Sequence, residues 1–122
     1  MRDRFRKSIL LFAGCLYLAA ADVSGTWVGR MEAIRPGNFV PVRLMLHKSG
    51  ESISGSIGPD AARQQPIEKP ILRGDQLTFE LYESQSMPKK IARFRLTITE
   101  RRLIGDVTTS DHEVARIDLD RP

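Results

Sequence analysis

Apolar and polar residues alternate, with a period of two, through most of the chain after Ser24. This period places every second side chain on one face of an extended strand, so it predicts β-strands with one buried face. Seven segments show the pattern clearly, at 27–32, 40–47, 53–57, 77–82, 92–99, 103–108 and 115–120. An eighth, less regular strand is predicted at about 66–72, where the adjacent apolar residues Ile71 and Leu72 indicate a β-bulge.

About eight short strands joined mostly by brief turns predict an all-β domain. A coiled antiparallel sheet with one apolar face suits a closed up-and-down barrel, which leaves no exposed edge strand. A two-sheet β-sandwich is the alternative. Gly55 and Gly105 lie in mid-strand on the inward face, where a glycine permits sharp coiling or a close approach of the neighbouring backbone.

Two predicted turns set the registers of their hairpins. A turn at Ser49-Gly50 predicts the pairs Leu46–Ile53, Leu44–Gly55 and Val42–Ile57. A turn at Glu100-Arg101 predicts the pairs Ile98–Leu103, Leu96–Gly105 and Phe94–Val107. On the outer face, the second register and the next hairpin place Asp106 between Arg95 and Arg116. Each pair in such a charge ladder contributes about 0.2–1 kcal/mol.

Residues 1–21 have the pattern of a cleaved secretory signal peptide, with early basic residues, an apolar run at 8–20 and small residues ending at Ala21. The apolar run is short for a bilayer-spanning helix, so no transmembrane span is expected. We expect cleavage after Ala21 and an exported barrel domain at 22–122, in the periplasm or outside the cell. Lipidation at Cys15 is the alternative, because Phe12-Ala13-Gly14-Cys15 resembles a bacterial lipobox.

The charge of the whole chain comes mostly from this leader. The chain has 19 Lys and Arg against 15 Asp and Glu, of which residues 1–21 hold four and one, leaving 15 against 14. The expected mature domain therefore has a net charge of +1, and its composition does not indicate nucleic-acid binding. The single cysteine, Cys15, lies in the leader, so the domain has to fold without a disulfide.

The predicted inward positions include four candidates for an interior ligand site, Trp27, Leu44, Phe79 and Phe94, and no charged residue. An eight-stranded barrel is either filled by its side chains or holds one small ligand. The bulky aliphatic residues favour a filled barrel, and a cavity would take a small apolar molecule. Carboxylates such as Glu80 fall at outward positions, where solvated ion pairs are expected.

Basic residues gather on or near one predicted hairpin, at Lys89, Lys90, Arg93, Arg95, Arg101 and Arg102. They form a candidate surface for an anionic partner, such as a polysaccharide, lipid headgroups or an acidic protein. The alternative is a solvated face that neighbouring acids neutralise. The connections at 58–66 and 84–90 are further candidates for recognition, or simple spacers, because loops on a rigid barrel often carry binding.

Catalysis has little support in the sequence. The two histidines, His47 and His112, are predicted on a polar strand face and in a turn, and neither has a metal-ligand spacing. The string at 54–58 lacks the following helix that a nucleophile elbow needs. The outward carboxylates do not converge on an enclosed acid–base pair. We therefore expect no enzyme activity, no cofactor and no metal; a hydrolase is the least favoured alternative.

Gly25-Thr26-Trp27 resembles the Gly-x-Trp opening of lipocalins and the Gly-Thr-Trp opening of avidins, which are calycin-like barrels. The resemblance implies that Trp27 packs at one end of the barrel and plugs it. Biotin binding is not implied, because avidin pockets are lined by several tryptophans and this chain has one. Small periplasmic barrels that inhibit secreted proteases or lysozymes are also similar in size and opening.

The sequence thus predicts an exported, non-catalytic binding barrel whose partner is a small apolar ligand or an exported protein. An inhibitor-type barrel that acts on a secreted hydrolase through its loops is the alternative.

Overall fold

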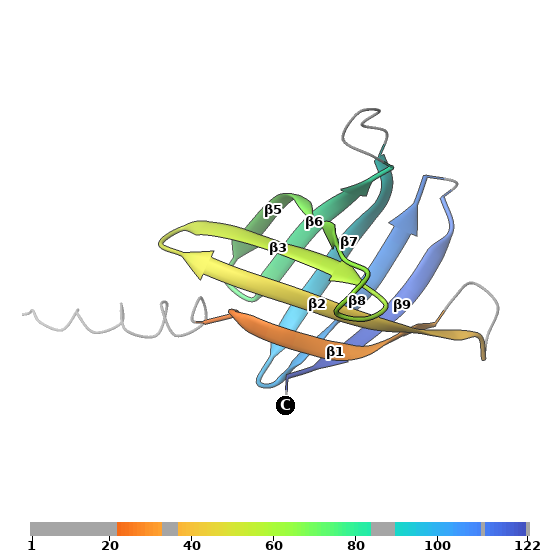
Figure 1. Ribbon diagram of the computed structural model, residues 1–122, viewed down its shortest axis with the longest axis horizontal. Coiled ribbons are helices and arrows are strands. Elements are labelled where there is room, and N and C mark those ends of the chain that lie inside the picture. Colours follow the sequence, from red (N-terminus) through yellow and green to blue (C-terminus); the bar gives the residue numbers. More distant parts are fainter. Residues whose placement is uncertain (1–21, 33–36, 84–89, 111, 122) are drawn as a thin grey trace, which may run out of the picture.

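The computed structural model describes residues 22–32, 37–83, 90–110 and 112–121. These residues form nine strands and no helix, as the alternating pattern predicted (Figure 1). The strands are β1 (Gly25–Glu32), β2 (Phe39–Ser49), β3 (Ser52–Gly58), β4 (Gln65–Pro66), β5 (Glu68–Arg73), β6 (Gln76–Tyr82), β7 (Lys90–Thr99), β8 (Arg102–Thr109) and β9 (Val114–Asp120).

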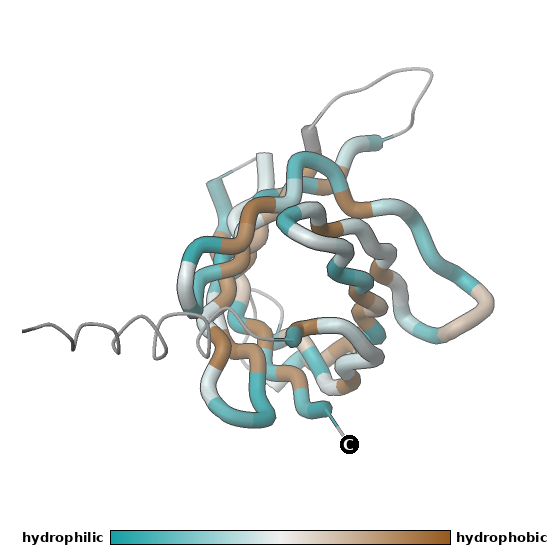
Figure 2. Tube along the Cα trace, turned by 90° about the vertical axis from the view of Figure 1, so that its left-hand side faces the viewer, coloured by the Kyte–Doolittle hydropathy of each residue, from teal (hydrophilic) through white to brown (hydrophobic). Residues whose placement is uncertain are grey.

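All nine strands belong to one antiparallel sheet in the order β4-β3-β2-β1-β9-β8-β7-β6-β5. Its two outermost strands, β4 and β5, are consecutive in the chain and flank Ile67. The N–H of Ile67 donates a hydrogen bond of 3.0 Å to the carbonyl oxygen of Gly55 in β3, while β5 pairs with β6. The sheet therefore curls into a nearly closed up-and-down barrel (Figure 2), which confirms the predicted fold class.

The predicted strand at 66–72 is divided at Ile67 into β4, which pairs with β3, and β5, which pairs with β6. The register of β5 against β6 shifts between Glu68 and Ile71, which confirms the predicted bulge. Within this irregularity Lys69 adopts a positive φ of 49°. The shift turns Ile71 toward solvent and lets Leu72 pack against the core.

The register of β2 against β3 differs from the predicted one by two residues. The observed pairs are Lys48–Ile53, Leu46–Gly55 and Leu44–Ile57, in place of Leu46–Ile53, Leu44–Gly55 and Val42–Ile57. The turn consists of Gly50-Glu51, one residue later than predicted, and Gly50 has a φ of 63°. Glycine favours this first turn position because it adopts positive φ without strain. A shift of two leaves the same side chains on the inward face.

The register of β7 against β8 is confirmed. The observed pairs include Ile98–Leu103, Leu96–Gly105, Phe94–Val107 and Arg95–Asp106. The connecting turn contains Glu100, whose φ of 48° lies in the left-handed region. This conformation costs a residue with a Cβ roughly 1–2 kcal/mol relative to glycine.

Replacing Glu100 with glycine should therefore raise the free energy of unfolding by about 0.5–1 kcal/mol, since part of the relieved strain is offset by the greater entropy of an unfolded glycine. Urea unfolding followed by circular dichroism measures this change. Glu100→Ala is the control, because it removes the same carboxylate and keeps the Cβ. Equal stability of the two variants would show that Glu100 is not strained.

One apolar cluster fills the inside of the barrel, with Trp27, Phe79, Leu44, Leu77, Leu96, Leu103, Ile117 and Leu119 as its largest fully buried side chains. All four predicted interior residues are buried. The rings of Phe79 and Phe94 stack with their centroids 4.5 Å apart.

The mid-strand glycines allow close contact between strands, as predicted. A Cβ at Gly105 would lie 1.9 Å from the carbonyl oxygen of Arg95, and a Cβ at Gly55 would lie 2.3 Å from that of Met45. The space beside both glycines is therefore occupied by the backbone of a neighbouring strand.

Candidate functional site

Side chains close the end of the barrel that holds Trp27. This tryptophan is fully buried, and its Nε1 donates a 3.0 Å hydrogen bond to the carbonyl oxygen of Val23. The guanidinium of Arg121 lies 4.4 Å from the centroid of the indole ring, a cation–π contact. Nη1 of Arg121 also donates to the carbonyl oxygens of Asp22 and Ser24, at 2.9 and 3.1 Å. Trp27 and Arg121 therefore fill this end of the barrel.

The opposite end of the barrel carries an apolar hollow of about 250 Å³, which we call the mouth pocket. It is lined by Met31, Val40, Pro41, Val42, Ile57, Gly58, Pro59, Gln65, Leu81 and Phe94. These residues come from six strands and the loop after β3, so the pocket opens beside the packed core at the mouth of the barrel. Among the lining residues that the structure describes, Gln65 alone has a polar side chain.

Of the four predicted interior candidates, only Phe94 lines the mouth pocket. Trp27 and Leu44 face each other across β1 and β2 at the closed end, and Phe79 stacks on Phe94 from β6. Sequence reasoning did not single out Met31 or Leu81 as site residues. The available signal was their position, because each is an inward residue of a strand segment distant from the closed end.

Polar contacts shape the β3–β4 loop, which borders the mouth pocket through Pro59. Oδ1 of Asp60 accepts hydrogen bonds of 3.0 Å from the N–H groups of Ala62 and Arg63. The side-chain hydrogen bond from Arg63 to this carboxylate lowers the pKa of Asp60. Gln64 Nε2 donates to the carbonyl oxygens of Asp60 and Arg43, at 2.8 and 3.1 Å. This candidate recognition loop therefore has a defined conformation.

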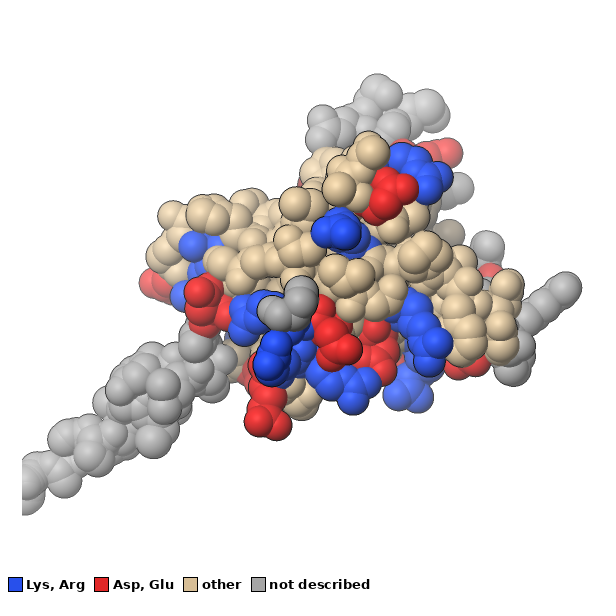
Figure 3. Space-filling model, turned by 60° about the horizontal axis from the view of Figure 1, so that its bottom comes forward, with Lys and Arg blue, Asp and Glu red and all other residues tan. Residues whose placement is uncertain are grey.

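The basic residues singled out in the sequence lie at separate places. Arg93 lies near the start of β7, whereas Arg101 lies in the turn after β7 and Arg102 is the first residue of β8. Arg102 pairs with Asp118 and Asp120, and Arg101 donates to the carbonyl oxygen of Arg121. Lys90 begins β7, while Lys89 and most of the 84–90 connection lie outside the described residues. Figure 3 shows basic and acidic side chains interleaved on one face of the molecule.

The prediction that Glu80 is solvated on the outer face is wrong. Its position in β6 is outward, but the residue is only 8% exposed. Oε1 accepts a 3.1 Å hydrogen bond from the Tyr82 hydroxyl, and Oε2 accepts one of 3.3 Å from Arg93 Nη2. Nζ of Lys69 lies 5.8 Å from the centroid of the Tyr82 ring. Long side chains from three strands therefore cover the carboxylate.

Lys69 belongs to this cluster electrostatically as well. A hydrogen bond to the Tyr82 hydroxyl, followed by electrostatic attraction to Tyr82 and Glu80, raises the pKa of Lys69 above its ordinary value.

His47 and His112 are both exposed, as the sequence predicted. In the described parts of the chain, no three His, Cys, Asp or Glu side chains are grouped so that they could hold a metal ion. Among the same residues, no helix has the length and apolar character needed to cross a bilayer. The predicted signal peptide at 1–21, including Cys15, lies outside the described residues.

The fold and the site define a small antiparallel barrel with one end closed by Trp27 and Arg121 and an apolar hollow at the other. Comparisons with protein-family models, with curated proteins and with solved structures found no match to this chain.

Proposed function

We propose that this protein is an exported, non-catalytic binding barrel that takes a small apolar group into its mouth pocket. The observation that carries the proposal is the lining of that pocket, whose described residues are apolar except for Gln65 and come from six strands at the mouth of the barrel. Concave, mostly apolar pockets in the mouths of β-barrels are common sites for small molecules. Removal of apolar surface from water supplies the driving force, at about 25 cal/mol per Å².

The volume of the mouth pocket restricts its ligand. About 250 Å³ is small compared with roughly 300–1,000 Å³ for typical ligand pockets. A single ring or a short branched alkyl group fits such a volume, as does the apolar end of a larger molecule. The remainder of a larger ligand would extend over the rim, where Val40 is exposed.

Membership of the calycin-like class and export of the domain belong to the same proposal. The single up-and-down sheet and the plugging position of Trp27 support the class. The leader pattern at 1–21 supports export to the periplasm or the cell exterior. Neither His47 nor His112 lines the mouth pocket, which is consistent with binding without catalysis.

An inhibitor-type barrel is the second candidate, and one observation favours it. The conformation of the β3–β4 loop is fixed by Asp60 and Gln64 beside the mouth pocket, so loop and pocket form one continuous surface. An apolar side chain of an exported hydrolase would then occupy the pocket in place of a free ligand.

Replacing Val40 with aspartate should weaken binding of the neutral apolar dye N-phenyl-1-naphthylamine, whose phenyl end suits the pocket, by roughly tenfold or more, because the bound dye would remove water from the new carboxylate. The protein is purified as it accumulates in cells that express the full chain. Energy transfer from Trp27, the only tryptophan of the chain, to the bound dye measures binding.

Val28→Asp is the matched control for this measurement. Val28 is 39% exposed and Val40 is 37% exposed, and they lie on the paired strands β1 and β2. Val28, however, faces outward and does not line the pocket, so its variant should bind the dye like the wild type. Equal weakening by both substitutions, or no energy transfer in the wild type, would refute the mouth pocket as the site.

A further inference from the structure

Two neighbouring rows of side chains cross the outer face of the sheet from β5 to β9. The strand registers give one row as Ile71, Thr78, Arg95, Asp106 and Arg116, and the other as Glu68, Glu80, Arg93, Thr108 and Val114. Strands in a sheet are about 4.8 Å apart, so each row is about 19 Å long. This face lies on the outer wall of the barrel, away from the mouth pocket.

Two adjoining hollows follow these rows, with volumes of about 280 and 480 Å³. The first includes Lys69, Ile71 and Thr78, and the second includes Thr108 and Val114. Arg93 and Arg95 line both hollows and separate them. We call the two hollows together the outer trough.

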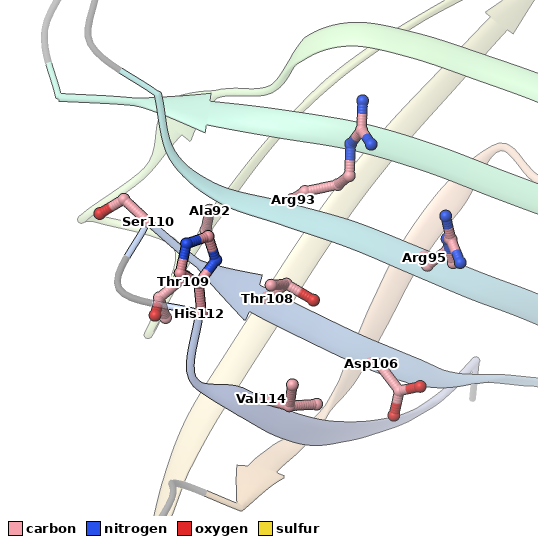
Figure 4. A pocket seen from close by; sticks show the side chains of 9 residues that line it. All are labelled: Ala92, Arg93, Arg95, Asp106, Thr108, Thr109, Ser110, His112 and Val114. Carbon is pink, nitrogen blue, oxygen red and sulfur yellow. The ribbon is translucent and has the colours of Figure 1, made fainter.

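Arg95 is the arginine lining the outer trough that has no acidic partner among the described residues. Arg93 pairs with Glu80 at 3.3 Å, and Asp106 pairs with Arg116 at 3.5 Å. No ion pair found in the described part of the chain includes Arg95. Figure 4 shows why Arg95 and Asp106 do not meet. Asp106 extends from β8 away from β7, whereas Arg95 extends from β7 away from β8. The predicted charge ladder is therefore present only in part: Asp106 pairs with Arg116, and the described residues show no ion pair between Arg95 and Asp106.

An exposed guanidinium in this setting is suited to bind a carboxylate. Its planar fork of N–H donors matches both oxygens of a carboxylate, which makes such pairs strong and directional. Arg93 lies two residues away on the same face and points to the same side as Arg95 (Figure 4), and Lys69 adds a third positive charge. Both acids of the trough, Glu80 and Asp106, already have cationic partners.

Apolar side chains lie at the two far ends of the outer trough. Val114 is 55% exposed and Ile71 is 47% exposed, the highest values among the large hydrophobic residues that the structure describes. Arg95 and Arg93 lie between them across the sheet. A partner that covers the whole trough therefore needs a central acid with an apolar group on each side.

We propose that the outer trough docks an extended acidic segment of a partner protein. Arg95 binds a carboxylate of the segment, and flanking apolar side chains pack on Ile71 and Val114. An extended chain advances about 3.3 Å per residue, so about six residues span the trough. An anionic polysaccharide would match the arginines but would leave both apolar ends uncovered.

Titration of the ¹⁵N-labelled protein with the peptide acetyl-Leu-Ser-Asp-Glu-Ser-Leu-amide tests this proposal. The amide resonances of Thr78, Arg95 and Thr108 should shift at millimolar peptide. Arg95→Gln should weaken binding about tenfold or more, the effect of losing one charged hydrogen-bonded pair. Arg73→Gln is the charge-matched control, because Arg73 is exposed at the end of β5 outside the trough.

Three results would overturn the proposal: no shift in the trough at millimolar peptide, equal weakening by Arg95→Gln and Arg73→Gln, or stronger binding of alginate than of the peptide at the same amides. The last result would assign the trough to an anionic polysaccharide. The peptide in which Asn and Gln replace Asp and Glu should bind the wild type weakly. Val40→Asp should leave peptide binding unchanged, so the trough and the mouth pocket are tested independently.

Discussion

Replacing Trp27 with alanine should lower the free energy of unfolding by about 3–5 kcal/mol, the range for truncating a large buried aromatic side chain. Trp27 is fully buried and packs at the closed end of the barrel. The variant would leave a cavity there, would lose the hydrogen bond to Val23 and would remove the ring beneath the Arg121 guanidinium. Because domain stabilities are only about 5–15 kcal/mol, this loss is a large share of the total.

Urea unfolding followed by circular dichroism measures this loss without relying on tryptophan fluorescence. Trp27→Phe is the second variant, because it keeps an aromatic ring for Arg121 and loses the Nε1 donor and part of the volume. It should cost about 1–3 kcal/mol, which is less than the alanine variant loses. A loss below about 1 kcal/mol for Trp27→Ala would contradict the account of this end as closed by packing.

Gly105→Ala should destabilise the barrel by about 3 kcal/mol or more, at the upper end of the usual range for overpacking. The added Cβ would lie 1.9 Å from the carbonyl oxygen of Arg95 and 2.9 Å from Cα of Leu96. Both are backbone atoms, so β7 and β8 have to separate to make room. The same unfolding measurement tests the change.

Thr108→Ala is the control for Gly105→Ala, because Thr108 lies in the same strand with an exposed side chain. Its stability should stay within about 1 kcal/mol of the wild type. Failure of Gly105→Ala to fold, next to a folded control, agrees with the account. A Gly105→Ala protein as stable as the wild type would show that β7 and β8 are not in close contact at this point.

The fold was accessible from the sequence because its main determinant is local. A period of two identifies strands and their inward faces, and the β7–β8 register follows from the turn at Glu100. The β2–β3 register was predicted two residues off, since turns one residue apart both use Gly50 and keep the same inward face. The one local signal that separates them is the preference of glycine for the first turn position.

Burial of Glu80 could not be predicted from its strand. Alternation correctly places Glu80 on the outer face, where most carboxylates are hydrated. Its burial depends on Tyr82, Lys69 and Arg93, whose long side chains come together from three strands. Such an arrangement depends on strand pairing across the sheet and leaves no mark in the local pattern.

The candidate sites were predicted only in part, for the same reason. The pattern identified Phe94 as an interior residue, but it does not indicate which end of the barrel is closed. That end is closed by the contact between Arg121 and Trp27, which are far apart in the sequence. Arg93 and Arg101 are close in sequence, yet eight residues of extended strand separate them by about 26 Å. The sequence could not identify Arg95 as an arginine without an ion pair, because this depends on Asp106 pairing with Arg116.

A comparison of two methionine methyl groups in one molecule tests the mouth pocket most directly. Met31 lines the pocket, whereas Met45 is 38% exposed on the outer face of β2. The protein, labelled with ¹³C-methyl methionine, is titrated with N-phenyl-1-naphthylamine and followed by NMR. We predict that the ring current of the bound dye shifts the Met31 methyl resonance and leaves that of Met45 unchanged. A shift of Met45 alone, or no shift of either at saturating dye, would contradict the central claim that the barrel binds apolar groups at its mouth.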